Sequence, residues 1–416
     1  MAEVAQLPLN EEQLVSKYHR SNLWRLTISQ ALAGANSVVI YATGAIVGSM
    51  LAPTAVLATL PISIFVVGMA SCVLPAGEIA RRFGRRMAFM VGTSTGALTG
   101  ILAALAMYFG WFWLFCFSAF LGGAYASVTV SFRFAAADGV PAEKRAQALS
   151  FVMIGGIAAG VIGPQLITHT MHLFPERLYV ATFIGQAIVA MLSGFILSGV
   201  RVPDIKQSKE VVGRTLTDIA TQPRFISAVI CGAASYLIMN FLMTSAPLAM
   251  QMHGHSYESA NLGIQWHVMA MYVPSFFTGK LISRFGATLV STVGIVLTGI
   301  SAMIGLLGSD VFHFYALLIL LGVGWNFGFL GASALVLECH RPEEKNQVQS
   351  LNDFIIFGLM AIGSFASGGV LSAYGWEVVL WLSLIPLVLA ALTLAATKIK
   401  RAEPLNQESR LGEVDL

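Results

Sequence analysis

The sequence predicts an all-α integral membrane protein, with twelve transmembrane helices in two pseudo-symmetric six-helix bundles. Three observations predict this fold: the composition, a series of long apolar runs, and a loop sequence that occurs once in each half. Of the 416 residues, 56% are hydrophobic and only 11% are charged, whereas a soluble domain has about 25% charged residues. A soluble globule cannot bury so much apolar surface, and disordered chains have the opposite composition.

The apolar runs are long enough to cross a bilayer, which requires about 20 residues per helix. We expect an N-terminal bundle over 24–199 and a C-terminal bundle over 225–397. The polar segments around them are expected to be a tail at 1–23, a linker at 200–224 and a tail at 398–416. The predicted spans are 24–48, 54–79, 87–108, 112–137, 146–171, 178–199, 225–250, 259–282, 287–307, 312–337, 349–372 and 376–397.

The basic residues predict the orientation. If the N-terminus is cytoplasmic, all but two of the 24 lysines and arginines fall in cytoplasmic segments. The exceptions are Arg133, inside a span, and Arg177, on the outer side. Because basic residues accumulate in cytoplasmic loops, we expect a multi-pass protein of the inner (cytoplasmic) membrane with both termini in the cytoplasm. The first apolar run is as long as a full span, so no cleavable signal peptide is expected.

The two halves repeat each other. The sequence from Gly77 to Gly84 (GEIARRFG) returns as Gly279 to Gly286 (GKLISRFG). A second pair, Pro-Ala-Glu-Lys and Pro-Glu-Glu-Lys, recurs at nearly the same spacing. Internal repeats are typical of secondary transporters, whose substrate site lies between the repeats near the middle of the membrane.

With these features the chain resembles the major facilitator superfamily over nearly its whole length. The signature of that family after span 2 reads G-x-x-x-D-R-x-G-R-R, and the residues that match it are Gly77, Arg82, Gly84, Arg85 and Arg86. The position of the family's aspartate is occupied by Arg81. The resemblance implies a transporter that works by alternating access, in which this loop latches the two halves together when the site faces outward.

The replacement of the family's aspartate by Arg81 suggests an ion pair in which the positions of the acidic and basic residues are exchanged. In the family the aspartate lies against the start of span 11, where this chain has Asp353. We expect Arg81 or Arg82 to pair with Asp353, and the alternative is that Asp353 only caps its own helix. The other residues expected at gates or helix interfaces are Gly77, Glu78, Gly84, Arg85, Arg133, Asp138 and Arg284, with Arg133 and Asp138 as a structural pair.

The substrate cavity is expected where polar and aromatic side chains lie near the middle of spans, since polar groups inside a membrane usually face a cavity or a partner. Trp325 beside Asn326 is the most informative pair because it lies at a span centre rather than in an interfacial belt. The alternative for the asparagines is hydrogen bonding between helices. The predicted cavity residues are Asn36, Tyr125, Tyr236, Asn240, His267, Tyr272, Trp325 and Asn326.

His267 is also the candidate for carrying a coupled proton, because histidine titrates near neutral pH. A neutral, hydrogen-bonded histidine is the alternative. The remaining histidines near the outer side have no carboxylate or cysteine at ligand spacing, so neither a metal site nor a cofactor is expected.

The cargo is expected to be uncharged, because no Lys, Arg, Asp or Glu lies at mid-depth in the inferred cavity. Amides, phenols and indoles suit a neutral aromatic or heterocyclic molecule, for example a vitamin such as riboflavin. A multidrug or metabolite exporter is the alternative, and a non-transporting sensor or assembly factor is an alternative of another class. We expect no enzyme activity and no nucleic-acid binding. The expected partners are a small solute, the lipid bilayer and a proton, with the protein acting as a monomer.

Overall fold

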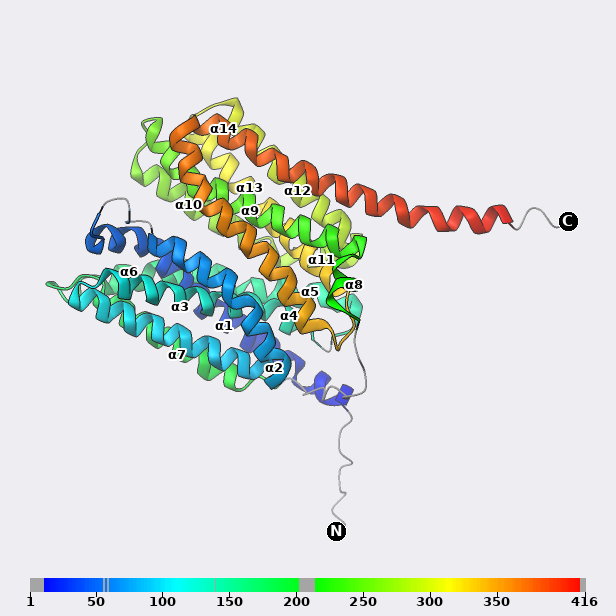
Figure 1. Ribbon diagram of the computed structural model, residues 1–416, viewed down its shortest axis with the longest axis horizontal. Helices are drawn as coiled ribbons and strands as arrows, with labels where there is room; N and C mark the ends of the chain where they lie inside the picture. Colours follow the sequence, from blue (N-terminus) through cyan, green and yellow to red (C-terminus); the bar gives the residue numbers. More distant parts are fainter. Residues whose placement is uncertain (1–10, 55–56, 58–59, 139, 202–213, 412–416) are drawn as a thin grey trace, which may run out of the picture. The chain divides into compact units, whose positions relative to one another are not determined.

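A computed structural model describes residues 11–54, 57, 60–138, 140–201 and 214–411. Within these residues the regular structure is helical, with no strand (Figure 1). Nine of the described segments are long and apolar enough to cross a membrane, and one of them, Leu60–Phe109, contains two of the predicted spans. The predicted linker residues 202–213, tail residues 1–10 and residues 412–416 lie outside the described part.

The first compact unit covers Met1–Val212. Its long helices, α1 and α2, pack against the others: α2 lies along α3 and α7, and α1 lies along α6 (Figure 1). Two predicted spans, 112–137 and 146–171, are each interrupted, so that α3 is followed by α4 and α5 by α6. The helices are α1 (Glu11–Leu51), α2 (Leu60–Phe109), α3 (Phe112–Val130), α4 (Phe132–Ala137), α5 (Ala142–Met153), α6 (Gly155–Thr170) and α7 (Val180–Ser198).

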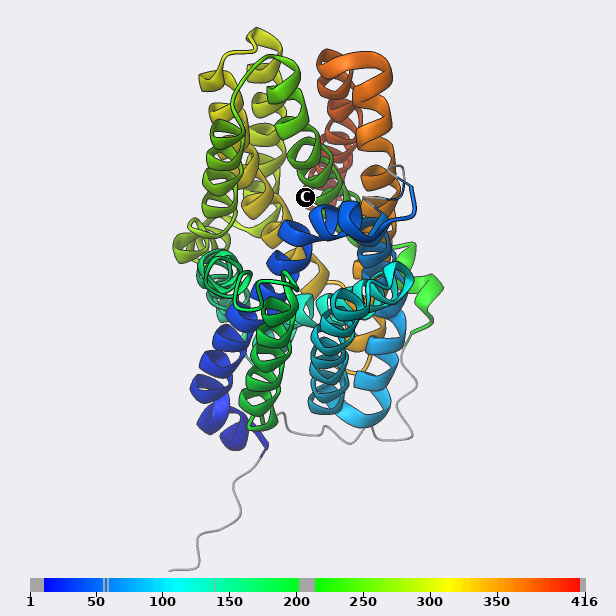
Figure 2. The ribbon, with the colours of Figure 1, turned by 90° about the vertical axis from the view of Figure 1, so that its left-hand side faces the viewer.

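The second compact unit covers Gly213–Leu416. In it α13 packs against α9, α10 and α12, and α14 packs along α9 and α12 (Figure 2). The predicted span 259–282 is broken into α10 and α11 at Pro274. The helices are α8 (Leu216–Ala220), α9 (Pro223–Met252), α10 (Tyr257–Tyr272), α11 (Ser275–Phe285), α12 (Ala287–Leu307), α13 (Val311–Leu337) and α14 (Lys345–Leu411).

The repeated loop sequence has the same backbone conformation in both units. Gly84 has φ 81° and ψ 159°, and Gly286 has φ 85° and ψ 151°. L-residues with a side chain avoid this region, and glycine adopts it freely. Each glycine therefore turns the chain between two antiparallel helices, and Gly375 (φ 81°) makes the same kind of turn within α14. The repeat seen in the sequence is thus also a repeat of local structure.

Glycines on α13 allow its neighbours to approach closely. A Cβ on Gly328 would lie 2.2 Å from Ser235 Oγ of α9, and a Cβ on Gly324 would lie 2.5 Å from Thr298 Oγ1 of α12. On the other side of the contact, a Cβ on Gly294 would lie 2.2 Å from the backbone nitrogen of Gly328. Such distances are too short for any side chain, so these glycines pack helices together. They bring α13 close to α9 and α12.

Candidate functional site

An aromatic cluster lies in the C-terminal unit and unites three of the predicted cavity residues. Trp325 and Phe329 of α13 stack with ring centroids 5.2 Å apart. The ring of Tyr236, from α9, meets the Trp325 ring edge-on at 5.5 Å, and that of Tyr272, from α10, does so at 5.9 Å. Phe357 of α14 contacts Tyr236 at 5.2 Å. Four helices therefore contribute to one aromatic site.

Two polar groups at this cluster are buried without a partner. The Trp325 side chain is 1% exposed, and its indole N–H has no hydrogen-bond partner among the described residues. Asn240 follows Tyr236 by one turn of α9, is 2% exposed, and has an unpartnered Nδ2 within the same described part. Because nearly all buried polar groups in proteins are paired, these two are candidates for ligand contact.

Asn326 has a different role from its neighbour. Its Nδ2 donates to the carbonyl oxygen of Met271 (2.7 Å) and to Ser275 Oγ (2.7 Å), and its Oδ1 accepts from Thr278 Oγ1 (2.6 Å). These three partners surround the break at Pro274, which has no backbone N–H to offer. The fully buried Asn326 side chain thus connects α13 to both sides of the break. This supports the helix-connecting alternative, and substrate contact by Asn326 stays a prediction.

His267 is fully buried in α10 and faces α13. Its Nδ1 lies 2.7 Å from the carbonyl oxygen of Leu318. Since a carbonyl can only accept, Nδ1 carries a proton in this arrangement. The opposite ring nitrogen, Nε2, has no hydrogen-bond partner among the described residues. The geometry suits a neutral histidine with one free nitrogen, and its part in proton coupling stays a prediction.

In the N-terminal unit the two predicted cavity residues, Asn36 and Tyr125, make different contacts. Asn36 donates from Nδ2 to Leu32 O (3.3 Å), and Gln186 of α7 donates from Nε2 to the carbonyl oxygen of Asn36 (3.3 Å). Tyr125 belongs to the hydrophobic core of this unit. Its ring fills the space that a Cβ on Gly96 would occupy. The packing of Tyr125 favours a structural role, and its place in a cavity remains untested.

The signature loop has its own local ion pairs. Arg81 binds the carboxylate of Glu78 through Nε (2.7 Å) and Nη2 (2.6 Å), and Arg82 pairs with the same carboxylate. Gly77 precedes Glu78 in α2 and is half-buried. Glu78 therefore holds in place both Arg81 and Arg82, which the sequence analysis predicted to lie at a gate or helix interface.

Arg85 reaches from the loop to the end of α4. Its Nε lies 2.5 Å from Asp138 Oδ2, and the two side chains are 5% and 13% exposed. Arg133 donates to the carbonyl oxygen of Val130, and its guanidinium lies 4.2 Å from the centroid of the Phe134 ring. The sequence placed Arg133 and Asp138 together. The pair that the structure defines by distance is Arg85 with Asp138.

The C-terminal counterparts are arranged differently. Arg284 is exposed, with its guanidinium 5.2 Å from the centroid of the Phe285 ring. Asp353 is buried and accepts a hydrogen bond from Asn352 Nδ2 (2.9 Å). Because α14 begins at Lys345, Asp353 lies about two turns inside the helix. The idea that Asp353 caps the N-terminus of its own helix is therefore wrong.

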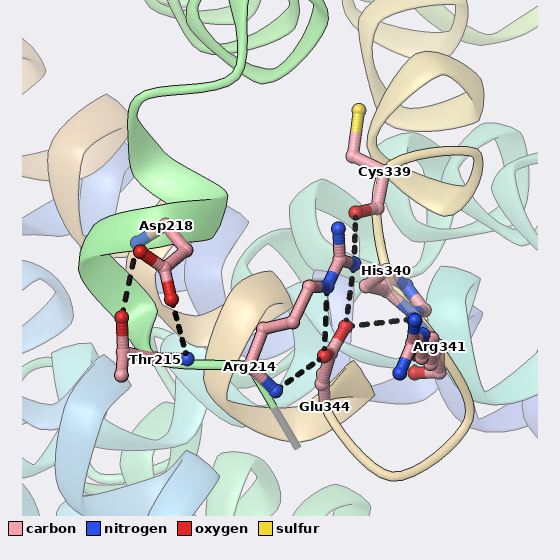
Figure 3. A network of polar contacts seen from close by, with 7 residues as sticks. All are labelled: Arg214, Thr215, Asp218, Cys339, His340, Arg341 and Glu344. Atoms are coloured by element: carbon pink, nitrogen blue, oxygen red, sulfur yellow. Dashed lines mark hydrogen bonds and ion pairs between the residues drawn. The ribbon is translucent and has the colours of Figure 1, made fainter.

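A polar network joins the start of the C-terminal unit to the segment after α13 (Figure 3). Arg214 binds Glu344 with Nε (3.0 Å), Nη2 (2.7 Å) and its backbone N–H (2.8 Å). Arg214 Nη2 also donates to Cys339 O (3.1 Å), and the backbone N–H of Arg341 donates to Glu344 Oε2 (2.9 Å). Arg214 thereby holds this segment against the residues that lead into α8.

The hydrogen bonds from the Arg214 side chain hold the pKa of Glu344 at about 2. Next to the network, Thr215 and Asp218 form a capping box at the start of α8. The sequence had shown Glu344 only as part of a repeated Pro-x-Glu-Lys segment. The sequence did not predict that Glu344 pairs with Arg214. It also did not predict the hydrogen bond of Gln186 to Asn36 or those of Asn326 to Ser275 and Thr278. Each of these contacts depends on which helices are neighbours.

A sequence profile of the Major Facilitator Superfamily matches residues 26–273 and 228–414. The chain belongs to this superfamily. It is therefore a multi-pass membrane transporter, and it has the fold of this superfamily, with twelve transmembrane helices in two six-helix halves. The family and its relatives below are transporters, in agreement with the expectation of no enzyme activity.

Characterised and uncharacterised relatives cover nearly the whole chain. It is 44% identical over 380 residues to the riboflavin transporter RfnT of Brucella anthropi, which covers 90% of this chain and 96% of that protein. It is 29% identical over 404 residues to the uncharacterised MFS-type transporter YdeG of Bacillus subtilis, with 92% of each covered.

Solved structures of the superfamily share the fold at low identity. The proton:xylose symporter XylE superposes with a TM-score of 0.75 and 16% identity, over 92% of this chain and 96% of that one. A bacterial homologue of the iron transporter ferroportin, in an outward-facing state, has a TM-score of 0.70 and 16% identity, over 90% and 98%.

Proposed function

We propose that this protein transports riboflavin across the cytoplasmic membrane by alternating access. The observation that carries the proposal is its 44% identity to a riboflavin transporter over almost the full length of both proteins. A match of this length includes both halves of this chain.

The site chemistry supports a flat, uncharged cargo. The cluster of Tyr236, Tyr272 and Trp325 offers aromatic rings from three helices, which suit a planar heterocycle. The buried polar groups beside it, Asn240 and Trp325, are neutral. A strongly charged cargo would be held without a counter-charge at this cluster, which is costly inside a membrane.

The direct test is uptake of radiolabelled riboflavin by proteoliposomes that contain the purified full-length protein. We expect time-dependent, saturable accumulation that unlabelled riboflavin abolishes and that empty liposomes lack. A flux of many unrelated drugs with no preference for riboflavin would indicate a multidrug exporter instead. Binding of riboflavin without any flux, in either direction and at several pH values, would indicate a sensor.

For the topology we propose that both termini lie in the cytoplasm and that the protein works as a monomer. The cytoplasmic position of the termini is supported by the placement of nearly all lysines and arginines in the segments that would then face the cytoplasm. Reporter fusions at the two ends of the chain test it. An alkaline phosphatase fusion should be inactive at both ends, because this reporter folds only outside the cytoplasm, and an active fusion would contradict the orientation.

The proposal includes two mechanistic parts. His267 is the group that carries a coupled proton, supported by its buried ring with one free nitrogen. Arg81 or Arg82 pairs with Asp353 during the transport cycle, supported by the exchange of an aspartate for Arg81 in the family signature.

A further inference from the structure

Beyond the identity of the cargo, several buried polar groups of the C-terminal unit have no hydrogen-bond partner among the described residues, and two of them lie at the aromatic cluster. The Trp325 indole N–H and the Asn240 amide are buried, at 1% and 2% exposure. Each has a nitrogen without a hydrogen-bond partner among the described residues. By contrast, the neighbouring Asn326 uses both ends of its amide. Unpartnered buried groups require an explanation, and these two are distinguished by their place at the aromatic cluster.

The two groups belong to one local arrangement. Asn240 follows Tyr236 by four residues on α9, so the two side chains lie on the same face of that helix, one turn apart. The Tyr236 ring in turn contacts the Trp325 ring at 5.5 Å. Trp325 is kept in place by stacking on Phe329 at 5.2 Å and by the edge of Tyr272 at 5.9 Å. The aromatic cluster thus joins the two helices that carry the unpartnered groups.

We propose that Trp325 and Asn240 recognise the polar edge of a planar ring in which a carbonyl, an N–H and a second carbonyl follow one another, as in an imide. The indole N–H can only donate, so it requires a carbonyl oxygen. An amide can donate from its NH₂ and accept at its oxygen, so Asn240 matches an N–H next to a carbonyl. The aromatic side chains then lie against the ring itself.

This inference rests on the proposed function and deepens it, because the tricyclic ring of riboflavin carries such an edge. It assigns specificity to two residues of one half of the protein. It also predicts that the protein discriminates between rings of the same size by their polar edge, which a general affinity for aromatic compounds would not do. A ring of the same size and shape should be rejected when its imide nitrogen carries a methyl group, since Asn240 would then face a methyl instead of an N–H.

The test is equilibrium binding to the purified full-length protein, with riboflavin and its N3-methyl derivative as probes. The variants are Trp325→Phe, which keeps an aromatic ring and removes the N–H, and Asn240→Ala. The matched controls are Trp266→Phe, at a tryptophan that is 51% exposed, and Gln265→Ala, at an exposed amide on the same helix α10. Melting curves of each variant separate loss of binding from loss of folding.

We expect the wild-type protein to bind riboflavin about tenfold more tightly than the N3-methyl compound, which is the usual effect of one buried hydrogen bond. Asn240→Ala should remove this preference. Trp325→Phe should weaken both probes by a similar factor, because both retain the carbonyls. Equal affinity of the wild-type protein for the two probes, or unchanged binding by a folded Trp325→Phe variant, would overturn the inference.

The outcome also separates this inference from the proposed function. If the wild-type protein does not bind riboflavin, the proposed cargo is wrong. Uracil and N3-methyluracil, which carry the same edge on a smaller ring, then test the edge by itself. If the wild-type protein does not bind uracil, or binds uracil and N3-methyluracil equally well, the proposed recognition of the imide edge is wrong as well.

Discussion

Arg214 encloses the carboxylate of Glu344 with three donors, two from its guanidinium and one from its own backbone N–H, at 2.7–3.0 Å. The carboxylate is nearly inaccessible, with a side chain 2% exposed. A bidentate guanidinium–carboxylate pair is stronger than a neutral hydrogen bond and more restricted in geometry. The pair fixes the segment between α13 and α14 to the point where the linker enters the C-terminal unit.

The first prediction concerns the stability of this pair. Glu344→Gln should lower the melting temperature of the purified protein by about 3–8 °C, because a single buried network is lost from a large domain. Arg214→Lys should also lower it, since a lysine cannot reproduce the two parallel hydrogen bonds. Glu143→Gln, at the exposed counterpart in the N-terminal half, is the control. Equal melting temperatures for Glu344→Gln and this control would contradict a stabilising role.

The second prediction is the acid dependence of the same contribution. The pKa of Glu344 is lowered from 4.5 to about 2, chiefly by hydrogen bonds from Arg214. A lowered pKa in the folded state stabilises the protein above pH 4.5, and this stabilisation is lost as the pH falls towards 2. The difference in melting temperature between wild type and Glu344→Gln should therefore be constant from pH 7 to 5 and shrink below 4.5. A difference at pH 2.5 as large as that at pH 7 would show that the charge of Glu344 is not its source.

The third prediction concerns the contacts of Asn326 with both sides of the Pro274 break. Asn326→Ala leaves the carbonyl of Met271 without this donor and Ser275 without this partner. Removing hydrogen bonds between buried groups costs about 1–3 kcal/mol, so we expect reduced thermal stability together with slower uptake. Gln265→Ala, at an exposed position of α10, should change neither. Normal uptake by a destabilised Asn326→Ala variant would show that the break serves stability alone.

The sequence was sufficient to predict the fold because membrane spans are encoded locally. Runs of apolar residues, the charge asymmetry of the loops and the repeated glycine turns each lie within a short window. Gly84 and Gly286 illustrate this, since the repeated letters predicted the same turn and the backbone angles agree. The break of one span into α10 and α11 was missed because a proline inside an apolar run leaves the hydropathy unchanged.

The candidate site was predicted less completely, since its side chains gain their roles from other helices. Depth within a span placed Tyr236, Tyr272 and Trp325 at one level, and the structure brings their rings together. Depth alone could not distinguish Trp325 from Asn326, although the Trp325 N–H has no partner among the described residues and the Asn326 amide is hydrogen-bonded at both ends. The pairing of Arg85 with Asp138 was equally inaccessible, because it depends on how α2 packs on α4.

The fourth prediction tests whether His267 carries a proton. His267→Asn keeps a donor near the Leu318 carbonyl, 2.7 Å from Nδ1 in the structure, but it cannot titrate. If His267 couples transport to protons, uptake by this variant should no longer respond to a pH gradient, while binding of riboflavin at one pH persists. His253→Asn, at the end of α9, is the control. An unchanged response to the gradient in His267→Asn would leave the histidine with a purely structural role.

The fifth prediction concerns the exchanged charge in the signature loop. Arg81 is held by Glu78 at 2.6 Å, and Asp353 is buried beside Asn352. If Arg81 pairs with Asp353 in one state of the transport cycle, Arg81→Asp and Asp353→Arg should each slow uptake, because each places two like charges opposite one another. The double variant should recover much of the rate, since it restores opposite charges in reverse. Transport no faster in the double variant than in the slower single variant would exclude the pair. Arg82→Asp combined with Asp353→Arg then tests the neighbouring arginine in the same way, which decides between the two residues proposed to bind Asp353.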